Sequence, residues 1–299
     1  MPDLKSTGLL ARWLLMAGAL LGAGSVSALK VDLYAIGHWT GGDTVPVAEA
    51  PSYDRPDWPG MALAWYNEMG ALGHTRTGAF IDGMMSAQRF CDLSTPGCQD
   101  FSYVDWPDAA IIAAHGTDGG DYWAALMRKK WSGDPYLRFG TAGVPHANPV
   151  VVGDGRLKFL HASSCQSLQD NYFANTWSGM QKAGDPDALH LLAGFHGYMW
   201  ISSAFNNDYK KTADWGHVIS VARSWVLNQY RVVSPGVEQC PTAYTVGTSG
   251  TAALSRLLLE RYNAVSGSPK DKGAGVPANW YAWIGYVGCD PNGAAPFKP

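Results

Sequence analysis

The chain has 299 residues, with 22 Lys and Arg against 25 Asp and Glu, for a formal net charge of −3. No basic stripe interleaved with aromatic residues occurs, so this balance argues against a nucleic-acid partner. Hydrophobic residues make up 46% of the chain, the share of a globular protein with a substantial core. The length favours one α/β domain over two small ones.

Residues 1–28 have the pattern of a secretory signal peptide. Lys5 and Arg12 are basic, the apolar run "WLLMAGALLGAG" follows Arg12, and "VSA" ends the segment with small residues. An uncleaved membrane anchor is the alternative, but the run is shorter than the ~20 residues that a spanning helix needs. We therefore predict cleavage, a single domain over residues 29–299, no membrane contact after cleavage, and a secreted or periplasmic location.

The first half of that domain alternates strand and helix patterns. Residues 31–36 are rich in β-formers and predict a strand. Residues 57–73 have apolar positions at helical spacing and glycines at the end, as a helix does. Residues 80–90 are ambiguous between helix and loop. Residues 108–116, "DAAIIAAHG", form a short apolar run typical of a buried parallel strand.

The middle of the chain continues this alternation. Residues 121–131, "DYWAALMRKKW", predict a helix, and the "GTDGGD" before it is interpreted as a turn that caps the helix or, alternatively, as a calcium loop. Residues 132–155 are rich in Gly and Pro and predict a loop. Residues 156–164 predict a strand, and residues 168–182 the helix after it.

The C-terminal part completes the pattern. Residues 188–197 predict a buried strand, residues 209–230 one long helical pattern, and residues 251–265 a helix entered through a Ser/Thr cap. Residues 279–288 predict a final strand. Strands that alternate with helices favour a mainly parallel sheet covered on both faces.

Five cysteines leave one without a partner in an oxidising compartment. Cys91 and Cys98 flank a turn-rich loop, and Cys240 and Cys289 lie in turn-flanked sequence near the C-terminus. We predict disulfides 91–98 and 240–289, which leave Cys165 free. A buried, inert thiol or a disulfide partner is the alternative for Cys165.

Cys165 and His115 each follow an apolar run, and His115 lies fifty residues before Cys165. If the two strands are neighbours, the carboxyl ends of parallel strands bring both side chains to one crevice. We interpret Cys165 as a nucleophile at a strand-to-helix junction, where the helix dipole lowers the thiol pKa, and His115 as the proton carrier. The N–H groups of Gly116 and Cys165 can then form an oxyanion site.

An apolar strand that ends in His-Gly, followed after about fifty residues by an apolar strand that ends in a small residue and Cys, resembles the caspase, legumain and gingipain group of cysteine peptidases. It is also similar to an exported bacterial family with no assigned activity. The resemblance covers about residues 108–168. It implies a caspase-like three-layer α/β/α fold and a dyad of His115 and Cys165. It also implies an oxyanion site at the N–H groups of Gly116 and Cys165.

The resemblance also implies that the strand after the Cys shapes the substrate pocket, which places His196, Tyr198 and Trp200 near substrate. His196-Gly197 repeats the His-Gly pattern, so His196 is a rival for the catalytic imidazole. Asp118, or alternatively Asp121, is a candidate partner for a cationic substrate side chain.

We therefore expect an exported cysteine peptidase-like hydrolase that cleaves amide bonds in a peptide or protein substrate and uses no cofactor. The alternatives are a non-catalytic domain of this fold that binds peptide or glycan in the same crevice, and an unrelated secreted hydrolase. A zinc site built from His115, Asp118, His161 and Cys165 is a further alternative, but no paired CxxC or HExxH supports a metal.

Overall fold

The structure is a computed structural model. It describes residues 28–93, 95–120, 122–139, 149–150, 152–153, 155–173, 175, 189–265 and 280–296. Apart from Ala28, the predicted signal peptide lies outside this part of the chain.

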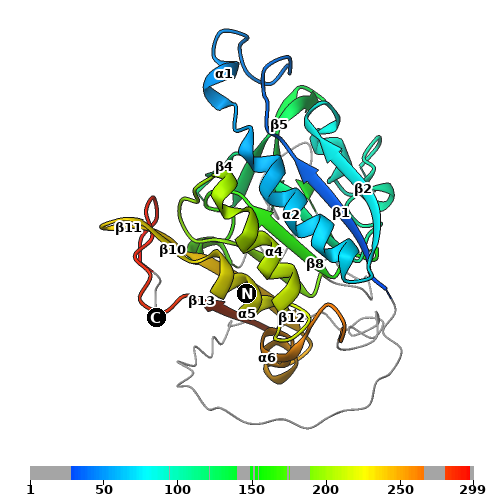
Figure 1. The fold of residues 1–299 in the computed structure, drawn as a ribbon. Coiled ribbons are helices and arrows are strands. Elements are labelled where there is room, and N and C mark those ends of the chain that lie inside the picture. The colour runs from blue at the N-terminus through cyan, green and yellow to red at the C-terminus, as the bar shows by residue number, and fades with distance from the viewer. Residues whose placement is uncertain are drawn as a thin grey trace.

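A seven-stranded sheet organises the described residues (Figure 1). Its strand order is β13-β12-β9-β8-β3-β1-β2. The neighbours from β2 to β9 pair in parallel, and β12 pairs antiparallel with both β9 and β13. The predicted mainly parallel sheet is confirmed, with two antiparallel pairings, both made by β12, toward one edge. The strands are β1 (Lys30–Ala35), β2 (Thr75–Ile81), β3 (Ala109–Ala113), β8 (Phe159–Ser163), β9 (Leu191–Phe195), β12 (Pro241–Gly247) and β13 (Trp280–Gly285).

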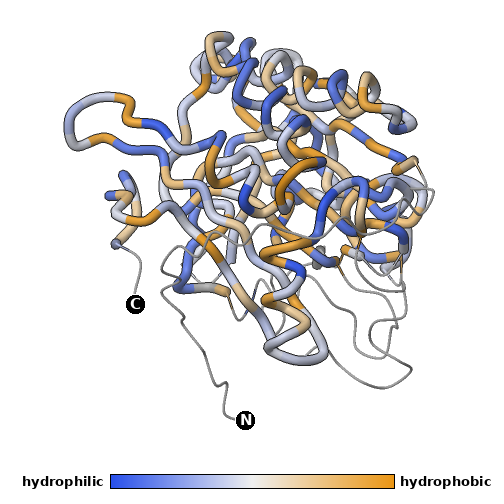
Figure 2. Tube along the Cα trace, turned by 60° about the horizontal axis from the view of Figure 1, so that its bottom comes forward, coloured by the Kyte–Doolittle hydropathy of each residue, from blue (hydrophilic) through white to orange (hydrophobic). Residues whose placement is uncertain are grey.

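The three central strands β3, β8 and β9 are buried at every position, as their continuous apolar sequences predict. Along the rest of the chain hydrophobic and hydrophilic stretches are interleaved, because most elements have one face in water (Figure 2). The hydrophobic core therefore lies along the central parallel strands, and two of these strands lead directly to His115 and Cys165.

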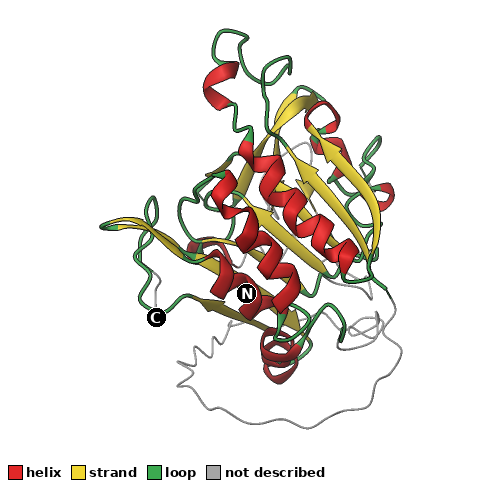
Figure 3. Ribbon diagram, in the orientation of Figure 1, coloured by secondary structure: helices red, strands yellow, loops and turns green. Residues whose placement is uncertain are grey.

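Helices cover one face of this sheet (Figure 3). Helix α2 packs on β1, β2 and β3, and α4 packs on α2 and α5. The helices are α1 (Ala50–Tyr53), α2 (Asp57–Ala71), α4 (Asn206–Trp215), α5 (Val221–Gln229) and α6 (Gly250–Leu259). Short 3₁₀-helices occupy Asp82–Met84, Ala87–Arg89, Asp100–Ser102, Asp170–Tyr172 and Ser203–Phe205. The three-layer arrangement stays a prediction, because most of the helix expected at residues 168–182 lies outside the described residues.

A second sheet corrects two predictions from the sequence. Its order is β4 (Gly116–Asp118), β5 (Trp123–Trp131), β6 (Asp134–Phe139) and β7 (Pro149–Val150). The helix predicted at residues 121–131 is therefore wrong, and so is part of the predicted loop at 132–155. Ala, Leu, Met and Lys favour helices locally, but β5 pairs on both sides with β4 and β6, and these contacts decide its conformation.

The turn at Asp118 is consequently a β-hairpin turn and caps no helix. The Gly119 N–H donates to the Tyr122 carbonyl (2.8 Å), and the Gly120 N–H donates to Asp118 Oδ1 (2.7 Å).

The single helix predicted over residues 209–230 is also wrong, because α4 ends at Trp215 and α5 begins at Val221. The Ser220 hydroxyl accepts the Arg223 N–H (3.3 Å) and thereby caps α5 as a separate helix. The predicted Ser/Thr entry to α6 is confirmed, since the Ser249 hydroxyl accepts the Ala252 N–H (3.1 Å). Strands β2, β12 and the small hairpin of β10 (Arg231–Ser234) and β11 (Val237–Gln239) were not predicted from the sequence.

Both predicted disulfides are present, Cys91–Cys98 and Cys240–Cys289, and Cys165 is free. The two bonds fit the predicted oxidising compartment. Among the described residues, no helix is long and apolar enough to cross a bilayer.

Candidate active site

The ends of β3 and β8 bring His115 and Cys165 to the same level of the sheet. The two strands are parallel neighbours, with Ala113 opposite Ser163. His115 lies two residues beyond Ala113, and Cys165 lies two residues beyond Ser163. The prediction that the two strands are neighbours is confirmed.

The imidazole of His115 is held by one backbone carbonyl and three aromatic rings. Its Nε2 lies 2.7 Å from the carbonyl oxygen of Tyr53. Because a carbonyl only accepts, Nε2 carries the proton and the lone pair is on Nδ1. The rings of Trp39, Trp58 and Tyr53 lie 4.5, 5.4 and 5.7 Å from the imidazole. His115 is therefore oriented with Nδ1 as its basic atom.

The thiol of Cys165 contacts the backbone of Met199, which follows β9. The Met199 N–H donates to the sulfur (3.5 Å), and the sulfur lies 3.7 Å from the Met199 carbonyl oxygen. Burial raises the pKa of the Cys165 thiol, although the Met199 N–H and the positive charge of Arg55 act in the other direction. The expected lowering of the thiol pKa by a helix dipole is therefore wrong. A turn, not a helix, directly follows Cys165, and the next described element is the short 3₁₀-helix Asp170–Tyr172.

Burial favours the neutral form of both His115 and Cys165. Burial lowers the pKa of His115, and the positive charge of Arg55 lowers it further, while the hydrogen bond to Tyr53 raises it. The same Arg55 charge acts on the thiol. One guanidinium thus lies within electrostatic reach of both groups. The structure therefore places a neutral imidazole and a neutral thiol at the ends of two neighbouring parallel strands.

Gly116 directs its N–H toward the turn that carries Cys165. The Leu126 N–H donates to the His115 carbonyl (2.8 Å), so residues 115 and 126 form a hydrogen-bonded pair of β4 and β5. In an antiparallel pair the next residue, Gly116, then points its N–H away from β5. Asp118 lies two residues further along β4, so its N–H points to the same side as that of Gly116, and it donates to Gln166 Oε1 (3.0 Å). The free edge of β4 therefore faces the Cys165 turn.

The backbones approach so closely at Gly116 that a side chain has no space. A Cβ there would lie 2.5 Å from Trp123 Nε1, and closer still to Ser164 Oγ and the Cys165 carbonyl oxygen. Trp123 Nε1 also donates to Ser164 Oγ (3.2 Å). Glycine is therefore required where the two strand ends meet.

A buried network lies under the strand that leads to Cys165. Trp58 Nε1 donates to Ser163 Oγ (3.1 Å), and the Tyr209 hydroxyl lies 2.6 Å from the same oxygen. The Trp58 ring also contacts His115. Helix α2 therefore contacts both strand ends through Trp58, and α4 contacts the end of β8 through Tyr209.

A pocket of about 430 Å³ opens beside His115. The segment after β1 and the strands β4, β5 and β6 line this pocket. Its lining includes the acidic Glu49 and the basic Arg55 and His115. The lining residues are Glu49, Ser52, Tyr53, Arg55, His115, Gly116, Thr117, Leu126 and Tyr136.

Comparison with known proteins gives a family. Residues 61–263, about two thirds of the chain, match the family described as Domain of unknown function (DUF6345). The chain belongs to this family. No match was found among curated proteins or among solved structures. The matched range of this DUF6345 protein includes β3, β8 and both strand-end residues His115 and Cys165.

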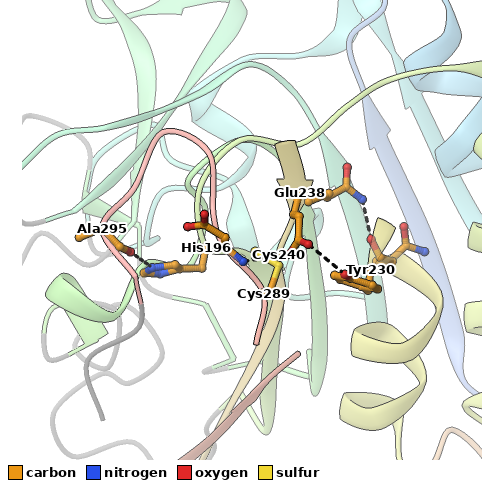
Figure 4. Close-up of a disulfide and its surroundings, with 9 residues drawn as sticks. His196, Tyr230, Glu238, Cys240, Cys289 and Ala295 are labelled. Carbon is orange, nitrogen blue, oxygen red and sulfur yellow. Dashed lines mark hydrogen bonds between the residues drawn. A yellow bond between two sulfur atoms is a disulfide. The ribbon is translucent and has the colours of Figure 1, made fainter. Parts of the chain in front are cut away.

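Three predicted substrate residues of this DUF6345 protein follow β9. His196 is buried, its Nε2 lies 2.6 Å from the Ala295 carbonyl oxygen (Figure 4), and its Nδ1 accepts the Asp170 N–H (3.3 Å). Both ring nitrogens are thus engaged, and the structure does not bring His196 into the pocket beside His115. Tyr198 is exposed and Trp200 is half-buried, on either side of the Met199 that contacts the thiol.

Asp118 lies on the free edge of β4, two residues beyond Gly116. Its carboxylate accepts the Gly120 N–H within the hairpin turn. Asp118 is not one of the residues that line the pocket. Asp121 lies outside the described residues.

The zinc alternative receives no support from the placement of its residues. His161 is fully buried, and its Nε2 lies 2.6 Å from the Tyr262 hydroxyl oxygen in the core. Within the described part of the chain, the three close ligand-type side chains are Glu238, Cys240 and Cys289, and the two cysteines are bonded to each other.

Sequence reasoning missed Tyr53, Arg55, Met199 and Gln166. Tyr53 and Arg55 follow β1, and Met199 follows β9, so the rule that sites gather at the carboxyl ends of parallel strands points to both loops. No local signal marks the Tyr53 carbonyl or the Gln166 side chain, because their roles depend on partners far along the chain.

Proposed function

We propose that this chain is an exported cysteine peptidase-like hydrolase with a caspase-like α/β domain, and that His115 and Cys165 are its catalytic dyad. The observation that carries the proposal is the register of β3 and β8, which sets a His and a free Cys at equivalent positions on neighbouring strand ends. The substrate is a peptide or protein.

The proposed reaction uses the neutral groups described above. Cys165 Sγ attacks the carbonyl carbon of the scissile amide, and its proton passes to His115 Nδ1. The oxyanion is stabilised by the N–H groups of Gly116 and Cys165. His115 then protonates the leaving amine as the C–N bond breaks, and water hydrolyses the thioester to restore the thiol.

Two features support these roles. The Tyr53 carbonyl holds the His115 proton on Nε2 and leaves Nδ1 free to accept. The Gly116 N–H lies on the edge of β4 that faces the Cys165 turn.

The test is cleavage of a peptide library by the purified, disulfide-intact chain, read by mass spectrometry. Cys165→Ala should abolish cleavage. His115→Ala should lower its rate by about 10²-fold or more, the usual contribution of a positioned acid–base group. His217→Ala is the matched control, because His217 lies beside His74 at the amino end of β2, away from the strand ends, and it should leave the rate unchanged.

Cleavage that persists in Cys165→Ala, or an equal effect of His115→Ala and His217→Ala, contradicts the proposal. A wild-type chain that binds library peptides without cleaving them supports the second candidate, a non-catalytic domain that binds peptide or glycan in this crevice. One observation favours that candidate. Burial raises the pKa of the Cys165 thiol, so the nucleophile is not ionised at rest.

A further inference from the structure

The residue directly after the free cysteine has an unusual backbone conformation. Gln166 has φ of 55°, in the left-handed region that side-chain-bearing residues rarely adopt. Such a conformation persists only where surrounding contacts impose it. The contacts of Gln166 therefore identify what fixes the Cys165 turn.

Gln166 makes three hydrogen bonds to three different segments. Its N–H donates to the Gly197 carbonyl (2.6 Å) after β9. Its Oε1 accepts the Asp118 N–H (3.0 Å) on the edge of β4, and its Nε2 donates to the Gly293 carbonyl (2.7 Å). One residue thus connects the strand edge beside Gly116, the loop beside the thiol, and the C-terminal part of the chain.

The C-terminal partner of Gln166 is itself fixed. We call residues 289–295 the C-terminal strap. Its first residue, Cys289, is bonded to Cys240 at the start of β12 (Figure 4). The next N–H, that of Asp290, donates to Glu238 Oε2 (2.9 Å). The strap is therefore tied to the antiparallel edge of the main sheet.

The far part of the strap lies against the loop after β9. The Tyr198 N–H donates to the Asn292 carbonyl (2.7 Å), and His196 Nε2 donates to the Ala295 carbonyl (2.6 Å). The contact with Ala295 explains why His196, the predicted rival for the catalytic imidazole, is buried. The strap is held on both sides of the carbonyl that Gln166 binds.

We propose that Gln166 is a positioning residue for Cys165, and that it couples the thiol to the disulfide-tethered C-terminal strap. The side chain holds the turn against β4 and the strap, so that the sulfur stays against Met199 and beside the Gly116 edge. The inference rests on the proposed function for its catalytic meaning, but the position of the thiol is measurable without a substrate.

Three variants separate positioning from folding. Gln166→Ala removes both side-chain bonds. Gln166→Gly also removes them but suits the left-handed φ, so that the chain still folds. Gln166→Glu keeps an acceptor for the Asp118 N–H and loses the donor to Gly293. The matched control is Gln88→Ala, because Gln88 Nε2 donates to the Gly97 carbonyl (2.9 Å) in the loop closed by the other disulfide.

The experiment measures the alkylation rate of Cys165 by iodoacetamide between pH 7 and 10 in the disulfide-intact chain, with thermal unfolding as a check of folding. Arg55 and Tyr209 lie within electrostatic reach of the thiol, and His115 is the proposed base on the neighbouring strand end. All variants retain these three groups. In Gln166→Gly and Gln166→Ala the loosened turn exposes the sulfur to water. Because burial raises the thiol pKa, that pKa should then fall, and alkylation at pH 7.5 should rise about tenfold.

Gln166→Glu loosens the turn less and adds a negative charge that disfavours the thiolate, so its alkylation rate should rise less than that of Gln166→Ala. Gln88→Ala should show no rise. Peptide cleavage should change in the opposite direction, with a lower kcat and little change in KM, because the sulfur is no longer aligned. A wild-type alkylation profile in Gln166→Gly, or an equal rise in Gln88→Ala, overturns the inference. A chain that cleaves no peptide but shows the tenfold rise contradicts the proposed peptidase and supports the positioning role.

Discussion

An alanine at Gly116 should displace the turn that carries Cys165. The added Cβ would lie 2.5 Å from Trp123 Nε1 and closer to Ser164 Oγ and the Cys165 carbonyl. Since ordinary van der Waals contacts begin near 3.4 Å, the neighbours must move by about 1 Å. Overpacking of this kind costs about 1–3 kcal/mol. The upper end is expected here, because one neighbour is backbone and the other two are hydrogen-bonded to each other.

The assay is denaturant unfolding of the disulfide-intact chain, with Gly60→Ala as the matched control. Gly60 lies inside α2, and a Cβ there meets no atom closer than 3.7 Å. Gly60→Ala should therefore stabilise the protein by about 0.5–1 kcal/mol, whereas Gly116→Ala should destabilise it by about 3 kcal/mol. At about 2–4 °C per kcal/mol for a domain of this size, the melting temperature of Gly116→Ala should fall by roughly 6–12 °C. Equal stability of the two variants would refute the close approach of the strand ends.

Two further predictions concern stability. Removal of the Cys240–Cys289 disulfide by serine substitutions should cost about 4 kcal/mol, and removal of Cys91–Cys98 about 2 kcal/mol, because the sequence separations are 49 and 7; equal costs in denaturant unfolding would contradict this. Burial lowers the pKa of His161 to about 3, so the unfolded chain takes up a proton below about pH 6.5 that the folded chain excludes. This contribution to the free energy of unfolding is full above pH 6.5 and is lost, by up to about 5 kcal/mol, as the pH falls toward 3. In His161→Phe the free energy of unfolding should therefore depend less steeply on pH across this range. An unchanged pH dependence would exclude His161 as a cause.

Local sequence accounted for the central parallel strands and their ends, but not for the parallel edge strand β2. Continuous apolar runs predict β3, β8 and β9 correctly, because strands buried on both faces need no alternation. The carboxyl-end rule then places His115 and Cys165 together once the strands are neighbours.

Local sequence failed where long-range pairing outweighs propensity. Residues 124–130 are all good helix formers, yet they lie in β5 because β4 and β6 supply partners on both edges. The prediction of a lowered pKa for the Cys165 thiol failed for a related reason. The expected dipole needed a helix directly after Cys165, and the structure instead has a turn and a buried sulfur.

The sequence by itself determined the parallel core, the two disulfides, the free Cys165, and the His-Gly and Cys strand ends. These features depend on apolar runs, turn-flanked cysteines and spacing along the chain. Only the tertiary structure decided the Tyr53 carbonyl on His115, the charge of Arg55 near both groups, and the contact of Gln166 with the C-terminal strap. Each of these joins segments far apart in the chain, and a backbone carbonyl or a buried charge leaves no local pattern in sequence.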